Sequence, residues 1–278
     1  MNKIKEPQYA AVVEKELNPR HGSYSMIVSP RREVSYDEDS DAEREYVTGM
    51  NRLCDGDIEG AKAHLEQSYK MGYLNAANTL AYGYSAGWFG NRDYDMFIRI
   101  IKQLVRKKHP SAMNNYGFAY EQGIGVKQSD HLSLFWYKKA AAAGDKDAKA
   151  NLGITYIFGD EAKRKPSAGV RLSFEAADLG QEMAMNTLGI CYEKGILVTR
   201  NPEKAFEWYK KAYENGCGST SELNLARCYE KGMGVERDIE KAAYYRQQAR
   251  EHGLNNDKES YFNDNHYICN AIMSYYEK

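Results

Sequence analysis

The sequence predicts an all-α fold, a right-handed superhelical solenoid of about six two-helix repeats with a terminal capping helix. Two ladders of glycine support this prediction. The first has spacings of 36, 36, 36 and 37 residues: Gly87, Gly123, Gly159, Gly195 and Gly232. The second has spacings of 36, 36 and 37 residues, at Gly144, Gly180, Gly216 and Gly253, and Gly72 lies two periods before Gly144. Two glycine breaks in a period of this length are typical of stacked helix pairs.

Residues 1–40 lack the repeat, and we expect a largely irregular or disordered N-terminal arm. One short amphipathic helix can form there, beginning near Pro7 and carrying Tyr9, Val12, Val13 and Leu17. An isolated helix this short is marginal in water and needs a surface. We therefore expect residues 7–17 to dock on the array or on a second copy of the chain, which would permit self-association.

The repeat region is predicted to span residues 41–254, with a shortened opening repeat at 41–73. The first helices of the later pairs align as AANTLAYGYSAG (76–87), AMNNYGFAYEQG (112–123), AKANLGITYIFG (148–159), AMNTLGICYEKG (184–195) and SELNLARCYEKG (221–232). Glycine recurs at one shared position in three of them, at Gly117, Gly153 and Gly189. Glycine costs about 1 kcal/mol inside a helix. Its recurrence predicts a neighbouring helix that approaches too closely for a side chain.

The second helices are predicted to open at Asp130, at Asn201–Pro202 and at Asp238, which are residue types that favour helix N-termini. We expect a core seam from a column of large residues and a column of alanine four positions later. These columns are Trp136, Leu172, Trp208 and Tyr245, then Ala140, Ala176, Ala212 and Ala249. Residues 255–278 carry apolar side chains at helical spacing and are expected to form the capping helix.

These repeats resemble the Sel-one-like repeat family, a branch of the tetratricopeptide class. The shared pattern is LGxxYxxGxGVxxDxxKAxxWYKKAAxxG, and the resemblance covers roughly residues 57–253. It implies an adaptor that assembles other proteins. The pattern fails at 88–108, where Lys108 replaces the terminal glycine, and at 160–169, where Asp160 and Glu161 replace the glycine–valine pair. We expect those two units to pack or curve differently.

Composition argues against several classes of function. The formal net charge is −1, which gives no overall attraction to nucleic acid or to anionic membranes. The basic clusters at 106–108 and 163–165 are the only support for a nucleic-acid reader, and such runs are usually solvated faces. No stretch approaches the roughly 18 apolar residues of a membrane span. We expect a cytoplasmic protein with no membrane span and no nucleic-acid partner.

We expect no metal and no cofactor, because the six histidines and five cysteines lack metal-ligand spacing and no phosphate-binding loop is present. The cysteines Cys191 and Cys228 share a column with Ala119 and Thr155, which indicates a small buried position. One string, GYSAG at 83–87, matches the nucleophile elbow of hydrolases. The repeat register places Ser85 near the end of a helix, so we interpret the match as chance and predict no catalytic residue.

The candidate partner-binding residues lie on the first helices, at an angle expected to face the concave groove. An apolar column ends in a basic residue: Tyr82, Phe118, Ile154, Ile190 and Arg227. A second column, three residues later, contributes the carboxylates Glu121, Glu193 and Glu230. Equally, positions 154 and 190 could pack on the next repeat. An amphipathic helix or extended peptide with basic flanks would complement such a groove.

Asn151 completes the candidate set, in a column with Asn115 and Asn224. In tetratricopeptide proteins that capture C-terminal carboxylates, asparagines at the matching position bind the ligand with the help of lysines four residues earlier. Here Asp147 stands at the lysine position before Asn151 and would repel a carboxylate. We favour a structural role for the column.

The sequence therefore predicts a non-enzymatic scaffold or adaptor that binds a partner protein or peptide on the concave face of the solenoid. Two alternatives stay open. The chain could be a regulatory subunit of a separately encoded enzyme, or a bacterial secreted effector that acts on host proteins.

Overall fold

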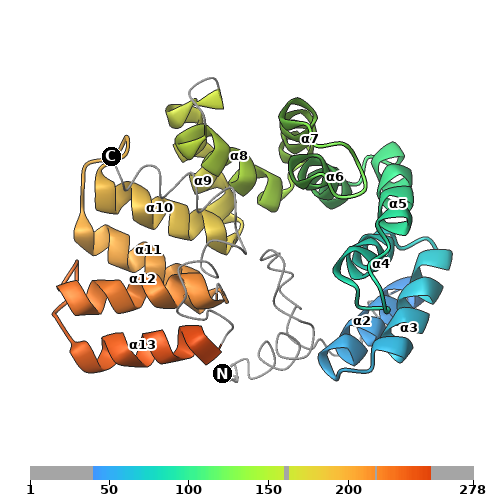
Figure 1. Cartoon of the computed structure of the whole chain (residues 1–278), viewed down its shortest axis with the longest axis horizontal. Helices are drawn as coiled ribbons and strands as arrows, with labels where there is room; N and C mark the ends of the chain where they lie inside the picture. Colours follow the sequence, from blue (N-terminus) through green and yellow to red (C-terminus); the bar gives the residue numbers. More distant parts are fainter. Residues whose placement is uncertain (1–39, 160–162, 217, 252–278) are drawn as a thin grey trace. The chain divides into compact units, whose positions relative to one another are not determined.

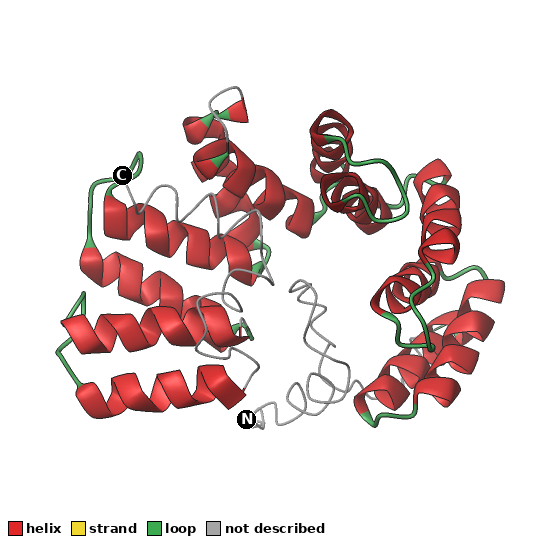
Figure 2. Cartoon of the chain, in the orientation of Figure 1, coloured by secondary structure: helices red, strands yellow, loops and turns green. Residues whose placement is uncertain are grey.

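The computed structural model describes residues 40–159, 163–216 and 218–251, and every regular element in these ranges is a helix (Figure 2). The all-helical prediction is confirmed for them. The predicted arm, apart from Ser40, and the predicted capping helix at 255–278 lie outside the described residues. Ser40 is the N-cap of the first described helix, and its side chain accepts a hydrogen bond from the Glu43 amide at 3.3 Å.

The chain forms two compact units that meet in sequence at Ala140 and Ala141. The first holds α2 (Asp41–Cys54), α3 (Ile58–Lys70), α4 (Leu74–Ala86), α5 (Tyr94–Arg106), α6 (Pro110–Gln122) and most of α7 (Asp130–Ala142) (Figure 1). The second holds α8 (Lys146–Phe158), α9 (Pro166–Asp178), α10 (Glu182–Lys194), α11 (Pro202–Glu214), α12 (Gly218–Lys231) and α13 (Ile239–Glu251).

Helix pairs organise each unit. In the first, α2 packs on α3 and α4 on α5, around a core that includes Leu65, Ile101 and Leu104. In the second, α8 packs on α9, α10 on α11, and α12 on α13, around a core that includes Ile154, Tyr209 and Leu225. Consecutive pairs also contact each other within a unit, as α9 and α10 do. Each pair therefore buries its apolar face against its neighbours.

The glycines inside the first helices lie where the second helix of the same pair comes closest. A Cβ on Gly117 would stand 2.8 Å from Cδ1 of Tyr137, and one on Gly153 would stand 2.6 Å from Oγ of Ser173. A Cβ on Gly189 would overlap the ring of Tyr209. Real Cβ atoms do not approach other atoms this closely, so the predicted close approach of helices is confirmed.

In the pairs α6–α7 and α10–α11, the core seam differs from the prediction by one residue. Tyr137 and Tyr209 are 1% and 0% exposed, while their neighbours Trp136 and Trp208 are only half-buried. The tyrosine points into the helix pair because a glycine faces it, and the tryptophan packs at the side. The alanine column is confirmed, since Ala140, Ala176, Ala212 and Ala249 are all fully buried.

The first helices mostly end at their ladder glycine, as predicted. Gly123 has φ +72° and its amide closes the last turn onto the Ala119 carbonyl. Gly159 departs from this geometry with φ −65°, next to the position where the sequence loses the glycine–valine pair.

The second helices begin at the caps Asn201 and Asp238, as predicted. At α7 the capping side chain is Ser129 rather than Asp130, because Ser129 Oγ accepts the Leu132 amide.

Candidate partner-binding surface

Each glutamate of the predicted carboxylate column is bound by a residue 16 positions later, on the second helix of its own pair. The Tyr137 hydroxyl donates to Glu121 at 2.8 Å, and the Tyr209 hydroxyl donates to Glu193 at 2.7 Å. In the last pair the partner of Glu230 is Arg246, which donates from Nη2 at 2.5 Å. The carboxylates are thus built into the helix pairs.

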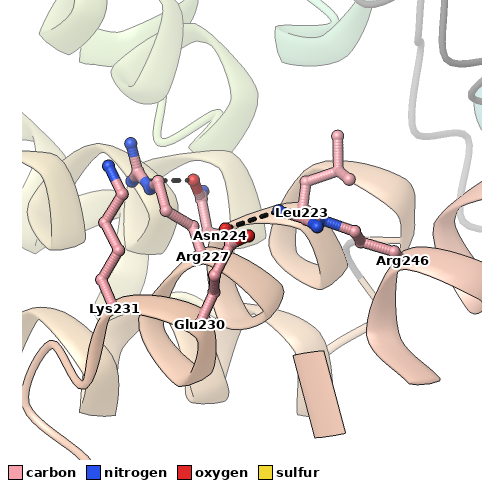
Figure 3. A pocket seen from close by; sticks show the side chains of 6 residues that line it. All are labelled: Leu223, Asn224, Arg227, Glu230, Lys231 and Arg246. Carbon is pink, nitrogen blue, oxygen red and sulfur yellow. Dashed lines mark hydrogen bonds and ion pairs between the residues drawn. The ribbon is translucent and has the colours of Figure 1, made fainter. Parts of the chain in front are cut away.

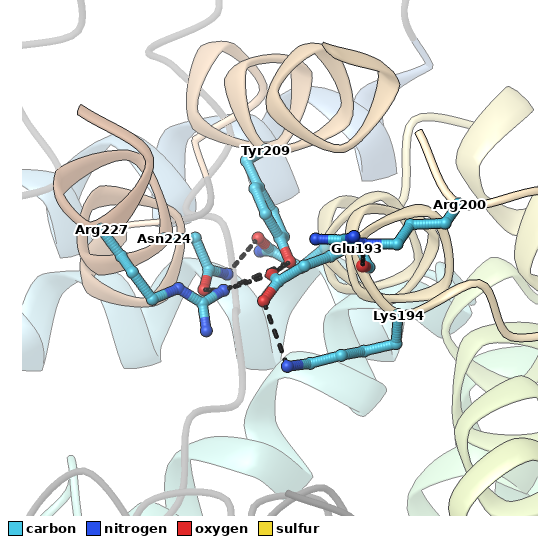
Figure 4. A network of polar contacts seen from close by, with 7 residues as sticks. Glu193, Lys194, Arg200, Tyr209, Asn224 and Arg227 are labelled. Atoms are coloured by element: carbon cyan, nitrogen blue, oxygen red, sulfur yellow. Dashed lines mark hydrogen bonds and ion pairs between the residues drawn. The ribbon is translucent and has the colours of Figure 1, made fainter. Parts of the chain in front are cut away.

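Glu193 lies at the centre of a polar network that joins α10, α11 and α12 (Figure 4). Its side chain is only 9% exposed, and Oε2 accepts from both Tyr209 and Nη2 of Arg227, the latter at 2.6 Å. Nη2 of Arg227 also lies 3.2 Å from Oδ1 of Asn224 and 3.4 Å from the Tyr209 hydroxyl. Lys194 approaches the other carboxylate oxygen at 3.4 Å. A hydrogen bond in which both groups are charged is among the stronger kinds, so the network holds Arg227 in place.

The asparagines connect successive first helices. Asn115 donates to Asn78 at 2.9 Å, and Asn224 donates to Asn186 at 3.1 Å. Asn224 and Asn186 are both buried. Buried amides need such partners because an unsatisfied polar group is costly. These contacts agree with the structural role favoured for the column.

An open pocket of about 280 Å³ lies on α12 and α13 (Figure 3). It holds two of the predicted residues, Arg227 and Glu230, together with Asn224 of the asparagine column. The other lining residues are Leu223, Lys231 and Arg246. Three cationic side chains and one carboxylate therefore surround the pocket.

The remaining predicted residues divide between half-buried and buried positions. Tyr82, Phe118 and Asn151 are half-buried. Tyr82 packs edge-on against Trp88, and burial raises the pKa of its hydroxyl to about 12. Ile154 and Ile190 are 1% and 7% exposed within the core of the second unit, so the expected apolar stripe is corrected at these two positions. They pack on neighbouring helices, which is the alternative that the sequence left open.

Asp147 lies beside Gln181, the N-cap of the next first helix, α10. Its carboxyl is half-buried and lies 3.4 Å from the side-chain amide nitrogen of Gln181. Burial, reinforced by the neighbouring Asp145 carboxylate, raises the pKa of Asp147 to about 6. The ionised carboxylate of Asp147 therefore lowers the stability of the folded protein at neutral pH.

Sequence reasoning missed a column of loop residues that donate to the ends of the first helices. Gln128 and Arg200 donate to the main-chain carbonyls of Glu121 and Glu193 at 2.9 and 3.1 Å. Arg237 makes the equivalent contact to the Glu230 carbonyl at 3.0 Å. Arg164, in the same column, donates instead to the carbonyl of Gly159, the residue that follows α8, at 2.9 Å. The signal was present, because these residues repeat with spacings of 36, 36 and 37. They satisfy helix-terminal carbonyls that have no partner inside the helix.

Ser85 lies in the last turn of α4, and its hydroxyl donates to the Tyr82 carbonyl at 2.8 Å. The strand that a nucleophile elbow requires is absent from the described residues, so the predicted helical position is confirmed.

The described residues bring together no group of three or more His, Cys, Asp or Glu able to hold a metal ion. Every helix in the described ranges is too short or too polar to cross a bilayer.

Cys191 and Cys228 are fully buried, and burial raises the pKa of each thiol to about 12. Ala119 and Thr155 in the same column are also buried, so the predicted small buried position is confirmed.

Comparison with known proteins identifies the repeat. The sequence model of the Sel1 repeat matches residues 110–145, 146–181, 182–217 and 219–254, just over half of the chain. A curated relative, the chitin synthase regulator SKT5 of Saccharomyces cerevisiae, is 36% identical over 99 residues, which are 34% of this chain. The matched segment spans only 14% of that relative's length.

Solved structures show the same architecture. The c5321 protein, described as a protective antigen of uropathogenic Escherichia coli with an SLR fold, is 28% identical, with a TM-score of 0.56. That match covers 78% of this chain and 47% of the other. A Sel1 repeat protein from Oxalobacter formigenes is 21% identical with a TM-score of 0.61, covering 81% of this chain and 98% of the other.

Proposed function

Because the chain belongs to the Sel1 repeat family, we propose that it is a non-enzymatic adaptor that binds a partner protein or peptide through its first helices. The surface we propose, called here the first-helix surface, is described separately for each unit. In the first unit it comprises Tyr82, Phe118 and Glu121; in the second it comprises Asn151, Glu193, Arg227 and Glu230. Proteins built from Sel1 repeats generally act as protein-interaction adaptors.

The observation that carries this proposal is the repetition of side chains at equivalent positions of successive first helices. A stack of repeats presents equivalent positions as an extended row, which suits recognition of another chain. Aromatic and arginine side chains contribute most of the energy of typical protein interfaces. Tyr82, Phe118 and Arg227 are the members of this kind, and all three are half-buried and keep some exposed area.

The test compares two phenylalanines of one helix pair. Phe118 belongs to the first-helix surface on α6, whereas Phe135 lies on the second helix, α7, and is 42% exposed. We expect Phe118→Ala to lose partners that the unaltered protein retains in quantitative affinity purification, and Phe135→Ala to keep them. Loss on Phe135→Ala alone would place the binding surface on the second helices.

A second candidate function is regulation of a separately encoded enzyme, and the resemblance to the yeast chitin synthase regulator favours it. In this case the partner lost from Phe118→Ala would be an enzyme, and adding the purified chain would change the rate of that enzyme. A partner without catalytic activity would leave the general adaptor function as the better description.

A further inference from the structure

The pocket on α12 and α13 has the opposite charge preference from the groove that the sequence suggested. Glu193 is nearly buried behind the pocket and bound by Tyr209 and Arg227. Glu230 is bound by Arg246. Their carboxylates are already engaged, so they offer little to a basic ligand. Three cations line the opening, Arg227, Lys231 and Arg246, and Glu230 is the one carboxylate of the lining. With Glu193 counted as the partner of Arg227, one positive charge remains in excess.

Arg227 is held by several side-chain contacts. Its Nη2 contacts Glu193, Tyr209 and Asn224, and the guanidinium lies over the Tyr209 ring with its carbon 6.0 Å from the ring centre. A guanidinium carries five N–H donors in a fixed plane and can serve two carboxylates at once. Because the side chain is already fixed, binding a second carboxylate loses little conformational entropy.

Lys231 and Arg246 supply positive charge on either side of Glu230 (Figure 3). The side chain of Arg246 is 43% exposed and Lys231 is exposed, so both remain in contact with solvent at the rim. Leu223 adds an apolar side chain to the lining. Mixed lining of this kind favours a ligand with carboxylates next to an apolar residue.

We propose that this pocket binds an acidic peptide segment, with an Asp or Glu carboxylate on Arg227 and Lys231 and an apolar residue beside Leu223. The proposal rests on the adaptor function and names the chemical class of the partner. Charge complementarity carries it, since a cationic pocket attracts anionic segments and rejects basic ones. The ligand is therefore acidic at this end of the array, in place of the basic-flanked peptide expected from the sequence.

The test uses the full chain and a fluorescein-labelled peptide, GSLDEDLGS, with its uncharged counterpart GSLNQNLGS, in fluorescence polarisation titrations. We expect the acidic peptide to bind and the uncharged peptide to bind at least about tenfold more weakly. Lys231→Gln and Arg246→Gln should each weaken binding by about fivefold. Lys210→Gln, at an exposed position of α11 outside the pocket lining, removes the same charge and should change affinity less than about twofold.

Glu230→Gln should change the affinity for the acidic peptide in the opposite direction from Lys231→Gln and Arg246→Gln. Removing the carboxylate of the lining should strengthen binding of the acidic peptide and would weaken binding at a site for basic ligands. Thermal melts of each variant check that the helices remain folded. Equal binding of both peptides, or unchanged affinity in both Lys231→Gln and Arg246→Gln, would overturn the proposal. If neither peptide binds but capture of partners still depends on Phe118, the pocket proposal fails and the adaptor function stands.

Discussion

At the scale of single residues, Lys108 occupies a position of the second glycine ladder with the backbone that glycine would adopt. Its φ is +58°, in the left-handed region, and its amide closes the end of α5 onto the Val105 carbonyl at 3.0 Å. A side chain in this region costs of order 1 kcal/mol relative to glycine. The fold tolerates that cost between α5 and α6.

We predict that Lys108→Gly raises the free energy of unfolding by about 0.5–1 kcal/mol. Glycine relieves the steric strain of a side chain at φ +58°, and this gain exceeds the stability lost because glycine makes the unfolded chain more flexible. Urea melts measure it. Lys107→Gly is the matched control, because Lys107 has φ −83° and glycine there should only destabilise. A gain in both variants would assign the effect to loss of charge.

Asp147 predicts a pH dependence. Its folded-state pKa of about 6 is above the ordinary value of 3.8, so the ionised carboxylate costs stability above pH 6 and the cost disappears as pH falls below about 4. Asp147→Asn should therefore stabilise the protein at pH 7.5, by about 1 kcal/mol after allowance for solvent screening. The gain should vanish near pH 4.

The control variant, Glu175→Gln, should change stability at neutral pH in the opposite direction. Lys149 donates a hydrogen bond to Glu175 at 2.8 Å and lowers the pKa of that carboxyl. The stability that this pair contributes is present at neutral pH and is lost as pH falls, so Glu175→Gln should lower the melting temperature at pH 7.5 only. Melts of both variants across pH 4–8 compare the two. A pH-independent gain for Asp147→Asn would contradict the assigned burial.

At the scale of elements, a buried tyrosine on the second helix faces the glycine of the first in the pairs α6–α7 and α10–α11. Tyr209→Ala removes a fully buried ring and leaves Glu193 without one donor, so we expect a loss of about 3–5 kcal/mol in the free energy of unfolding. Trp208→Ala should cost less than half as much, because Trp208 is half-buried. Denaturant melts rank the two variants. A larger loss of stability for Trp208→Ala than for Tyr209→Ala would show that the tryptophan, and not the tyrosine, forms the core seam.

The period of the sequence was enough to predict the helix pairs, the alanine seam and the positions of the terminal glycines. It could not choose between Trp208 and Tyr209, since both are large aromatic residues and either can face a core. The choice follows from Gly189, whose missing side chain admits only the ring placed opposite to it. Likewise, spacing placed Glu193 and Glu230 on one face but not their bound partners, because a side chain's partner depends on contacts between helices.

At the scale of the whole molecule, a substitution that destabilises one repeat mainly destabilises the repeats next to it, because each repeat contacts mainly its neighbours. We predict that Tyr209→Ala lowers hydrogen-exchange protection in α10 to α13 and leaves that of α2 and α3 unchanged. Mass-spectrometric exchange of the folded variant measures both regions. A uniform loss of protection across all described helices would mean that the two units unfold as one.

The bond between Tyr209 and Glu193 also bears on how such chains change length. Both residues fall within the single Sel1 match at 182–217, and Tyr137 and Glu121 fall together within the match at 110–145. A duplication or deletion of one complete repeat therefore carries donor and acceptor together and leaves no buried carboxylate behind at the junction. Gene rearrangements in steps of about 36 residues would be tolerated, whereas those of half a repeat would separate the pair.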